Sequence, residues 1–137
     1  MMHSNKAAAQ YRSVRSHGLV ADASPTRLVQ IMFEHVLSNL AIAQGCMERI
    51  VDNRPLSDVV AKGAAMGKAI RLIGQLDASL DMERGGQIAE NLRSLYVYML
   101  ARLTLANAIN DTAVVAEVSK LVSEIKFGWD QIVADHQ

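Results

Sequence analysis

The residues of this sequence best suited to chemistry are its histidines and its one cysteine, because imidazole and thiol groups act as metal ligands, bases and nucleophiles. The histidines are His3, His17, His35 and His136, and the cysteine is Cys46. Their scattered positions do not match the spacing of zinc ligands. The sequence also lacks the Glu-x-x-His pair of di-iron helical bundles. We therefore expect no metal, no cofactor and no catalytic site.

His35 is the one histidine that could still carry covalent chemistry. A histidine on a bundle helix can accept a phosphoryl group, as in phosphotransfer domains. Such domains usually place Lys-Gly shortly after the histidine, whereas residues 36–39 read Val-Leu-Ser-Asn here. Two alternatives therefore stay open: a phosphotransfer-type signalling bundle that uses His35, and a non-catalytic helical adaptor that dimerises through an apolar face.

Gly85-Gly86 is the only double glycine that could suggest a phosphate-binding loop. No Lys-Ser or Lys-Thr follows it and no strand pattern precedes it, so the phosphate-loop motif is absent. Two residues without a Cβ can reach positive φ at little cost and stop a helix. The pair therefore predicts a break between two helices.

Composition narrows the classes of protein that the chain can belong to. Apolar residues make up 50% of the 137 residues, which favours one packed domain over a disordered chain. The formal net charge is zero, which argues against nucleic acid or an anionic membrane as partner. A single cysteine permits no internal disulfide. With no signal-peptide pattern and no uncharged apolar run of about twenty residues, we expect no membrane insertion and a cytoplasmic location.

Four stretches repeat apolar residues every three or four positions, as amphipathic helices do. The first stretch should begin with Ser24 as the cap and Pro25 in the first turn, and should end before Pro55. The second should begin at Ser57, the third after the double glycine, and the fourth after a cap at Asp111. Four such helices with short loops predict an all-α fold, an antiparallel up-down-up-down four-helix bundle.

The helical spacing also predicts which residues face the core. Ile132 should point inward from the fourth helix, and Asp58 and Lys62 should form an i,i+4 ion pair on the second. The third helix carries an apolar stripe on one face, and it has further apolar residues off that stripe, so it should contact more than its neighbours in the bundle. The stripe consists of Ile88, Leu92, Leu95, Met99, Leu103 and Ala106.

The sequence before this bundle has a different character. Residues 1–22 are polar and rich in small residues, and few of them could form a buried face. We expect a flexible arm over 1–22 and the helical-bundle domain over 23–137. Tyr11 is the candidate functional residue of the arm, as part of a flap that rests on an apolar groove when the ligand is absent.

An ordered set of residues extends along the chain around the double glycine. Its central part is Ser79, Leu80, Asp81, Glu83, Gly85, Gly86, Ile88, Ala89, Asn91, Leu92, Leu95, Tyr96, Tyr98, Met99, Ala106 and Asn107. It is preceded by Ala23, Ser24, Pro25 and Leu28, and followed by Glu117, Val118, Leu121 and Trp129. In order and spacing this set resembles the flagellin-specific export chaperones, the FliS family. The resemblance covers residues 11–130 of the chain.

The resemblance implies a protein-binding function. Family membership would make the chain a cytoplasmic chaperone that binds the disordered C-terminal segment of flagellin, prevents its premature polymerisation and keeps it competent for type III export. The segment would fold into amphipathic helices in apolar grooves of the bundle. The resemblance also implies links to an export-gate protein and an anti-sigma factor. We expect a monomer or a weak homodimer.

The expected partner site lies on the outer faces of the second and third helices. One departure from the family pattern is Phe33-Glu34-His35, where members commonly have Tyr-Asp-Gly. The loss of the tyrosine hydroxyl and the added bulk of His35 put the local packing in question. The expected site residues are Tyr11, Ile70, Ile73, Asn91, Leu92, Leu95, Tyr96, Met99 and Asn107.

Overall fold

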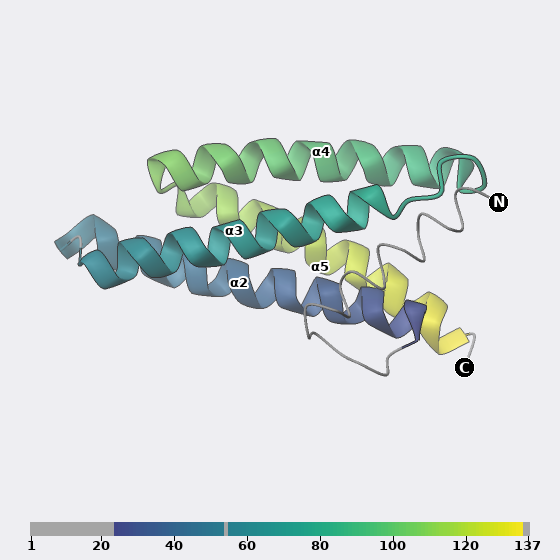
Figure 1. Cartoon of the computed structure of the whole chain (residues 1–137), viewed down its shortest axis with the longest axis horizontal. Coiled ribbons are helices and arrows are strands. Elements are labelled where there is room, and N and C mark those ends of the chain that lie inside the picture. The colour runs from purple at the N-terminus through teal and green to yellow at the C-terminus, as the bar shows by residue number, and fades with distance from the viewer. Residues whose placement is uncertain (1–23, 54, 136–137) are drawn as a thin grey trace.

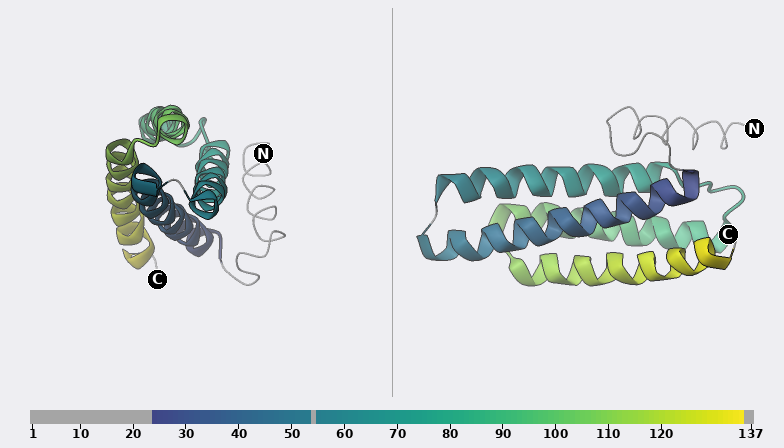
Figure 2. Two further views of the ribbon diagram at one scale, coloured as in Figure 1. Left: turned by 90° about the vertical axis from the view of Figure 1, so that its left-hand side faces the viewer. Right: turned by 90° about the horizontal axis from the view of Figure 1, so that it is seen from below.

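The computed structural model describes residues 24–53 and 55–135, and this part of the chain folds into four long helices. These are α2 (Pro25–Asn53), α3 (Leu56–Ala78), α4 (Gly86–Ile109) and α5 (Thr112–Asp135). Successive helices run in opposite directions and surround a shared interior (Figures 1 and 2). The predicted all-α four-helix bundle is confirmed. The predicted arm over 1–22 lies outside the described residues.

The helices pack as a ring with an aliphatic centre. α2 packs against α3 and α5, and α4 packs against the same two helices, so α2 and α4 lie on a diagonal. Burying one large aliphatic side chain stabilises a fold by about 1.5–3 kcal/mol. The largest fully buried side chains include Leu28, Met32, Leu40, Met47, Met66, Ile73, Met99 and Leu103.

The ends of the helices follow the capping residues that the sequence offers. The Ser24 hydroxyl accepts a hydrogen bond from the Arg27 amide at 3.2 Å, and the Asp111 carboxylate accepts one from the Val114 amide at 3.2 Å. Both predicted caps are confirmed. α3 begins one residue earlier than predicted, at Leu56.

The connection between α3 and α4 needs its two glycines for different reasons. A Cβ on Gly85 would lie 2.5 Å from the Ala89 Cβ and 2.8 Å from the Asp81 carbonyl oxygen, so no larger residue fits. Gly86 has open space around it but adopts a φ of +52°, which other residues reach only with strain. The predicted helix break is confirmed.

The predicted ion pair between Asp58 and Lys62 is wrong, because each side chain has a partner on another helix. Asp58 accepts a hydrogen bond from Arg49 Nε of α2 at 2.9 Å. Lys62 Nζ donates to the Asn107 carbonyl oxygen at 2.8 Å and to Asn110 Oδ1 at 2.7 Å. Lys62 therefore places a positive charge at the C-terminal end of α4, where it is favourable.

Candidate functional site

An apolar pocket of about 370 Å³ opens at the end of the bundle where α2 begins and α5 ends. Its volume lies within the range of small-ligand sites, about 300–1,000 Å³. All four helices contribute to its walls, because this end brings together the first turns of α2 and α4 and the last turns of α3 and α5. The main apolar walls are formed by Ile88, Leu92 and Tyr96 of α4 and by Ile125, Trp129 and Ile132 of α5.

Two isoleucines of the pocket keep much of their surface in water. Ile88 is 73% exposed and Ile132 is 50% exposed, although the helical spacing predicts that Ile132 points inward. That prediction is wrong for a geometric reason. The next residue in each helix, Ala89 or Val133, is buried at 3% or 6% exposure, so the two isoleucines lie at the edge of the core-facing side rather than on it. Exposed aliphatic side chains beside an open pocket provide an apolar contact surface for another molecule.

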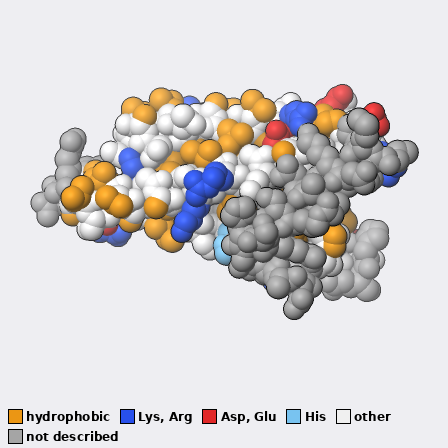
Figure 3. Space-filling model, in the orientation of Figure 1, with side chains coloured by type: hydrophobic (Ala, Val, Ile, Leu, Met, Phe, Trp, Pro, Cys, Tyr) orange, Lys and Arg blue, Asp and Glu red, His pale blue; other side chains and the backbone are white. Residues whose placement is uncertain are grey.

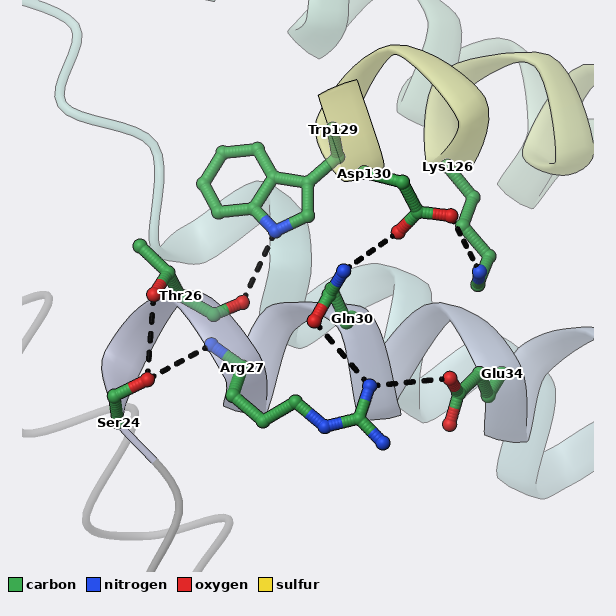
Figure 4. A network of polar contacts seen from close by, with 8 residues as sticks. All are labelled: Ser24, Thr26, Arg27, Gln30, Glu34, Lys126, Trp129 and Asp130. Carbon is green, nitrogen blue, oxygen red and sulfur yellow. Dashed lines mark hydrogen bonds and ion pairs between the residues drawn. The ribbon is translucent and has the colours of Figure 1, made fainter. Parts of the chain in front are cut away.

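Trp129 is held against the pocket by a hydrogen bond to α2. Its Nε1 donates to the carbonyl oxygen of Thr26 at 3.0 Å, although the two residues lie 103 positions apart (Figure 4). A partly buried indole usually finds such a partner for its N–H group. The bond fixes the last turns of α5 on the first turn of α2 and leaves the ring as a wall of the pocket.

A polar network extends from this contact along α2 and α5 (Figure 4). Gln30 Nε2 donates to Asp130 Oδ1 at 2.8 Å, and Lys126 Nζ lies 2.7 Å from Asp130 Oδ2. The hydrogen bond from Lys126 is the main reason why the pKa of Asp130 lies below its ordinary value. Gln30 also accepts a hydrogen bond from Arg27 at 3.2 Å. The network therefore stabilises the side of the bundle that carries the pocket.

The structure places two of the predicted site residues in the pocket wall. Leu92 is half-buried there, and Tyr96 contributes to the wall although it is only 3% exposed. Ile70 and Leu95 are half-buried and pack against the core. Tyr11 lies outside the described residues.

The outer-face position predicted for Ile73 and Met99 is wrong. Ile73 is buried and Met99 is fully buried in the core, so a molecule on the surface does not reach them in this structure. Both fall on the apolar stripes of their helices, and the periodicity that identified them could not tell which neighbour they face.

The two predicted asparagines are separate from the pocket. Asn91 is exposed and its Oδ1 accepts a hydrogen bond from Gln87 at 2.9 Å. Asn107 is half-buried, and its carbonyl oxygen accepts the hydrogen bond from Lys62. Within the described residues, the Asn107 Oδ1 atom is buried without a hydrogen-bond partner.

The prediction missed the α2 and α5 walls of the pocket. Phe33 of α2, Gly128 and Trp129 belong to the lining, but the predicted site drew on α3 and α4 together with Tyr11. A signal was present in the sequence, because Gly128 interrupts an apolar helix beside the only tryptophan of the chain. Helical periodicity identified which residues of α5 face the other helices, but it could not show which of these residues line a pocket instead of the closed core.

The histidine and the cysteine of the described helices lie apart from this pocket. His35 is half-buried on α2 and is not part of the pocket. Between residues 24 and 135, apart from residue 54, no group of three or more His, Cys, Asp or Glu side chains could hold a metal ion. Among the four helices of the bundle, none combines the length and the apolar character that crossing a membrane requires.

Fold and pocket together define the class of the protein. It is a helical bundle with an aliphatic core and an apolar surface pocket, an architecture suited to receiving apolar side chains of another molecule. The sequence profile of the family described as flagellar protein FliS matches residues 6–136. The chain therefore belongs to the FliS family.

Curated relatives agree with this assignment over nearly the whole chain. The flagellar secretion chaperone FliSB of Pseudomonas aeruginosa is 47% identical over 131 residues, which cover 96% of this chain and 98% of the relative. The flagellar secretion chaperone FliS of Salmonella typhimurium is 42% identical over 123 residues, covering 89% and 86%. The protein of the same name from Bacillus subtilis is 27% identical over 114 residues, covering 83% and 79%.

Proposed function

We propose that this protein is a flagellar export chaperone that binds the C-terminal segment of flagellin in the cytoplasm. Family membership and the names of the relatives support the chaperone role. The observation that carries the proposed binding mode is the apolar pocket with Ile88 and Ile132 at its opening. A disordered segment with an amphipathic pattern could fold in this pocket and cover both side chains.

The proposed mechanism is a temporary replacement of contacts. Apolar side chains of the bound segment are removed from water when they pack against the pocket. This burial stabilises the complex by about 25 cal/mol per Å² of buried apolar surface. While these side chains are covered, they are not available to other flagellin molecules, so the flagellin stays monomeric until export. Part of this favourable free energy offsets the entropy that the segment loses when it becomes ordered. The net affinity is therefore moderate, and the segment can be released.

The proposed roles of the predicted site residues differ. Leu92 and Tyr96 form the wall that the segment contacts, while Ile73 and Met99 support this wall from the core. Tyr11 acts as a flap over the pocket. Ile70, Leu95, Asn91 and Asn107 would contact parts of the segment that extend beyond the pocket.

A calorimetric titration tests the choice of segment. A peptide with the C-terminal segment of flagellin should bind the full chain with a negative heat-capacity change, because apolar surface is buried. A peptide of equal length from the N-terminal segment should give no binding heat. Equal binding of both peptides, or binding of the N-terminal one alone, would show that the proposed function is wrong.

Variants of the exposed isoleucines test the choice of surface. Ile88→Ser and Ile132→Ser should each weaken binding roughly three- to forty-fold, because the still exposed part of each side chain can contribute about half to three-quarters of the roughly 1.5–3 kcal/mol of a whole isoleucine. Val60→Ser is the matched control, since Val60 is 63% exposed near the start of α3, at the far end of the bundle. Figure 3 shows hydrophobic side chains at that end as well. If the control loses as much affinity as the pocket variants, the segment binds elsewhere.

A further inference from the structure

The charged groups of the pocket are all acidic. Among its described lining residues, Asp81 and Glu124 are charged, and no lysine or arginine is present. The lining also includes the Ser79 hydroxyl, which donates to the Leu76 carbonyl oxygen at 2.8 Å. An apolar cavity with this rim disfavours an anionic group and favours a cationic one beside an apolar anchor.

The two carboxylates differ in their present contacts. Asp81 accepts a hydrogen bond from the Arg84 amide at 3.1 Å, and its other oxygen lies 3.9 Å from Arg84 Nε. Glu124 is exposed and forms no hydrogen bond or ion pair with any described residue. Glu124 is therefore the carboxylate that a partner can pair with at no cost to an existing contact.

Gly128 lies one turn after Glu124 on the same face of α5, because residues four apart in a helix are neighbours. A Cβ at Gly128 would have no described atom within 4 Å, although the residue lines the pocket. Gly63 and Gly74 also have open space, but they do not line the pocket. The missing side chain at Gly128 therefore lets another molecule approach the backbone of α5 beside Glu124.

We propose that the pocket selects a segment in which an apolar anchor and a lysine or arginine lie within about one helical turn of each other. The anchor lies against Gly128 and Trp129, and the cation pairs with Glu124. This inference rests on the proposed function, because it assigns a chemical pattern to the bound segment. It adds a basis for selection that apolar contact alone does not provide.

The test measures how Glu124 couples to single charges of the C-terminal flagellin peptide. Glu124→Gln should weaken binding about two- to five-fold, the range of an exposed ion pair. The loss of affinity should appear at about 0.01 M salt, where the Debye length is about 30 Å. It should disappear at about 1 M salt, where the Debye length is about 3 Å and the ion pair is screened. Glu48→Gln is the matched control, an exposed carboxylate on α2 that does not line the pocket.

Charge reversal identifies the pairing residue on the peptide. Glu124→Lys should weaken binding further, and replacing one particular lysine or arginine of the peptide by glutamate should restore it. Equal effects of Glu124→Gln and Glu48→Gln, or rescue by no peptide position, would overturn this inference while peptide binding itself still supports the proposed function. If the wild-type chain does not bind the peptide at all, both proposals are wrong.

Discussion

Two neighbouring glycines of the α3–α4 connection make different demands on the chain. Gly85 is needed for space, since a Cβ there would overlap Ala89, and Gly86 is needed for its φ of +52°. Each substitution therefore has its own physical cost: steric overlap at the first position and backbone strain at the second.

Replacing these glycines should reduce stability by different mechanisms. Gly86→Ala should cost about 1–2 kcal/mol because a left-handed conformation strains a residue that has a Cβ. Gly85→Ala should cost about 1–3 kcal/mol because the overlap must be relieved by moving α4. Gly74→Ala is the control and should stabilise the fold by up to about 1 kcal/mol, since it fills open space in a helix. Midpoints of urea denaturation measure all three, and a neutral Gly85→Ala would contradict the steric account.

Asp130 should make stability depend on pH in the acidic range. Its folded-state pKa lies below the ordinary value of 3.8, so the contact with Lys126 contributes fully above that value and is lost as the pH falls through the folded-state pKa. At about pH 7, Asp130→Asn should reduce the free energy of unfolding by about 0.5–1 kcal/mol, as partly exposed ion pairs do.

Urea denaturation of the wild type and the variant at low salt and at several pH values measures this effect, because an uncharged denaturant does not screen the ion pair. The difference between the two proteins should be constant above the ordinary pKa and should shrink below it. Asp135→Asn, a change at an exposed carboxylate in the last turn of α5, should show no such difference. A gap between wild type and Asp130→Asn that widens on acidification would contradict the assignment.

Among the elements, α4 depends on α3 for the cap at its C-terminal end. Lys62→Met keeps much of the side-chain volume but removes the donor to Asn107 and Asn110 and the charge near the helix end. The substitution should lower the free energy of unfolding by about 1 kcal/mol. Lys68→Met is the control on the same helix, because Lys68 is exposed and has no hydrogen bond to a described residue. Thermal unfolding compares the two variants, and an equal shift of both would refute the capping role of Lys62.

In α5, stability and binding should oppose each other at Gly128. Gly128→Ala should raise the free energy of unfolding by up to about 1 kcal/mol, because alanine favours a helix and nothing in the described chain obstructs its Cβ. The same methyl group narrows the pocket and should weaken binding of the C-terminal flagellin peptide. Gly63→Ala should stabilise the fold without this loss. Urea denaturation measures the stability of both variants, and calorimetry measures their affinity for the peptide. Unchanged affinity of Gly128→Ala would contradict the contact proposed there.

The helices themselves follow from local signals in the sequence. Ser24, Asp111 and the double glycine fix their ends through groups that act within a few residues, and apolar periodicity fixes their inner faces. Contacts between helices could not be predicted in this way. Lys62 had a neighbour of opposite charge on its own helix, yet its partners belong to the end of α4.

At the scale of the whole molecule, the pocket arises where the ends of four helices meet. Ile88 and Ile132 lie next to the buried Ala89 and Val133, so they stand at the edge of the core-facing side of their helices and remain exposed. The sequence therefore predicted the fold correctly but placed the site on α3 and α4. The pocket also includes α2 and α5, which the arrangement in space brings together.

The central claim is that the C-terminal segment of flagellin occupies this pocket, and the single tryptophan of the chain offers a direct test. Trp129 lines the pocket and is partly exposed, so its emission reports on water at that site. A C-terminal flagellin peptide without tryptophan should shift the emission to shorter wavelength with the same midpoint as the calorimetric titration, and the N-terminal peptide should cause no shift. Calorimetric binding of the C-terminal peptide with unchanged Trp129 emission would contradict the account.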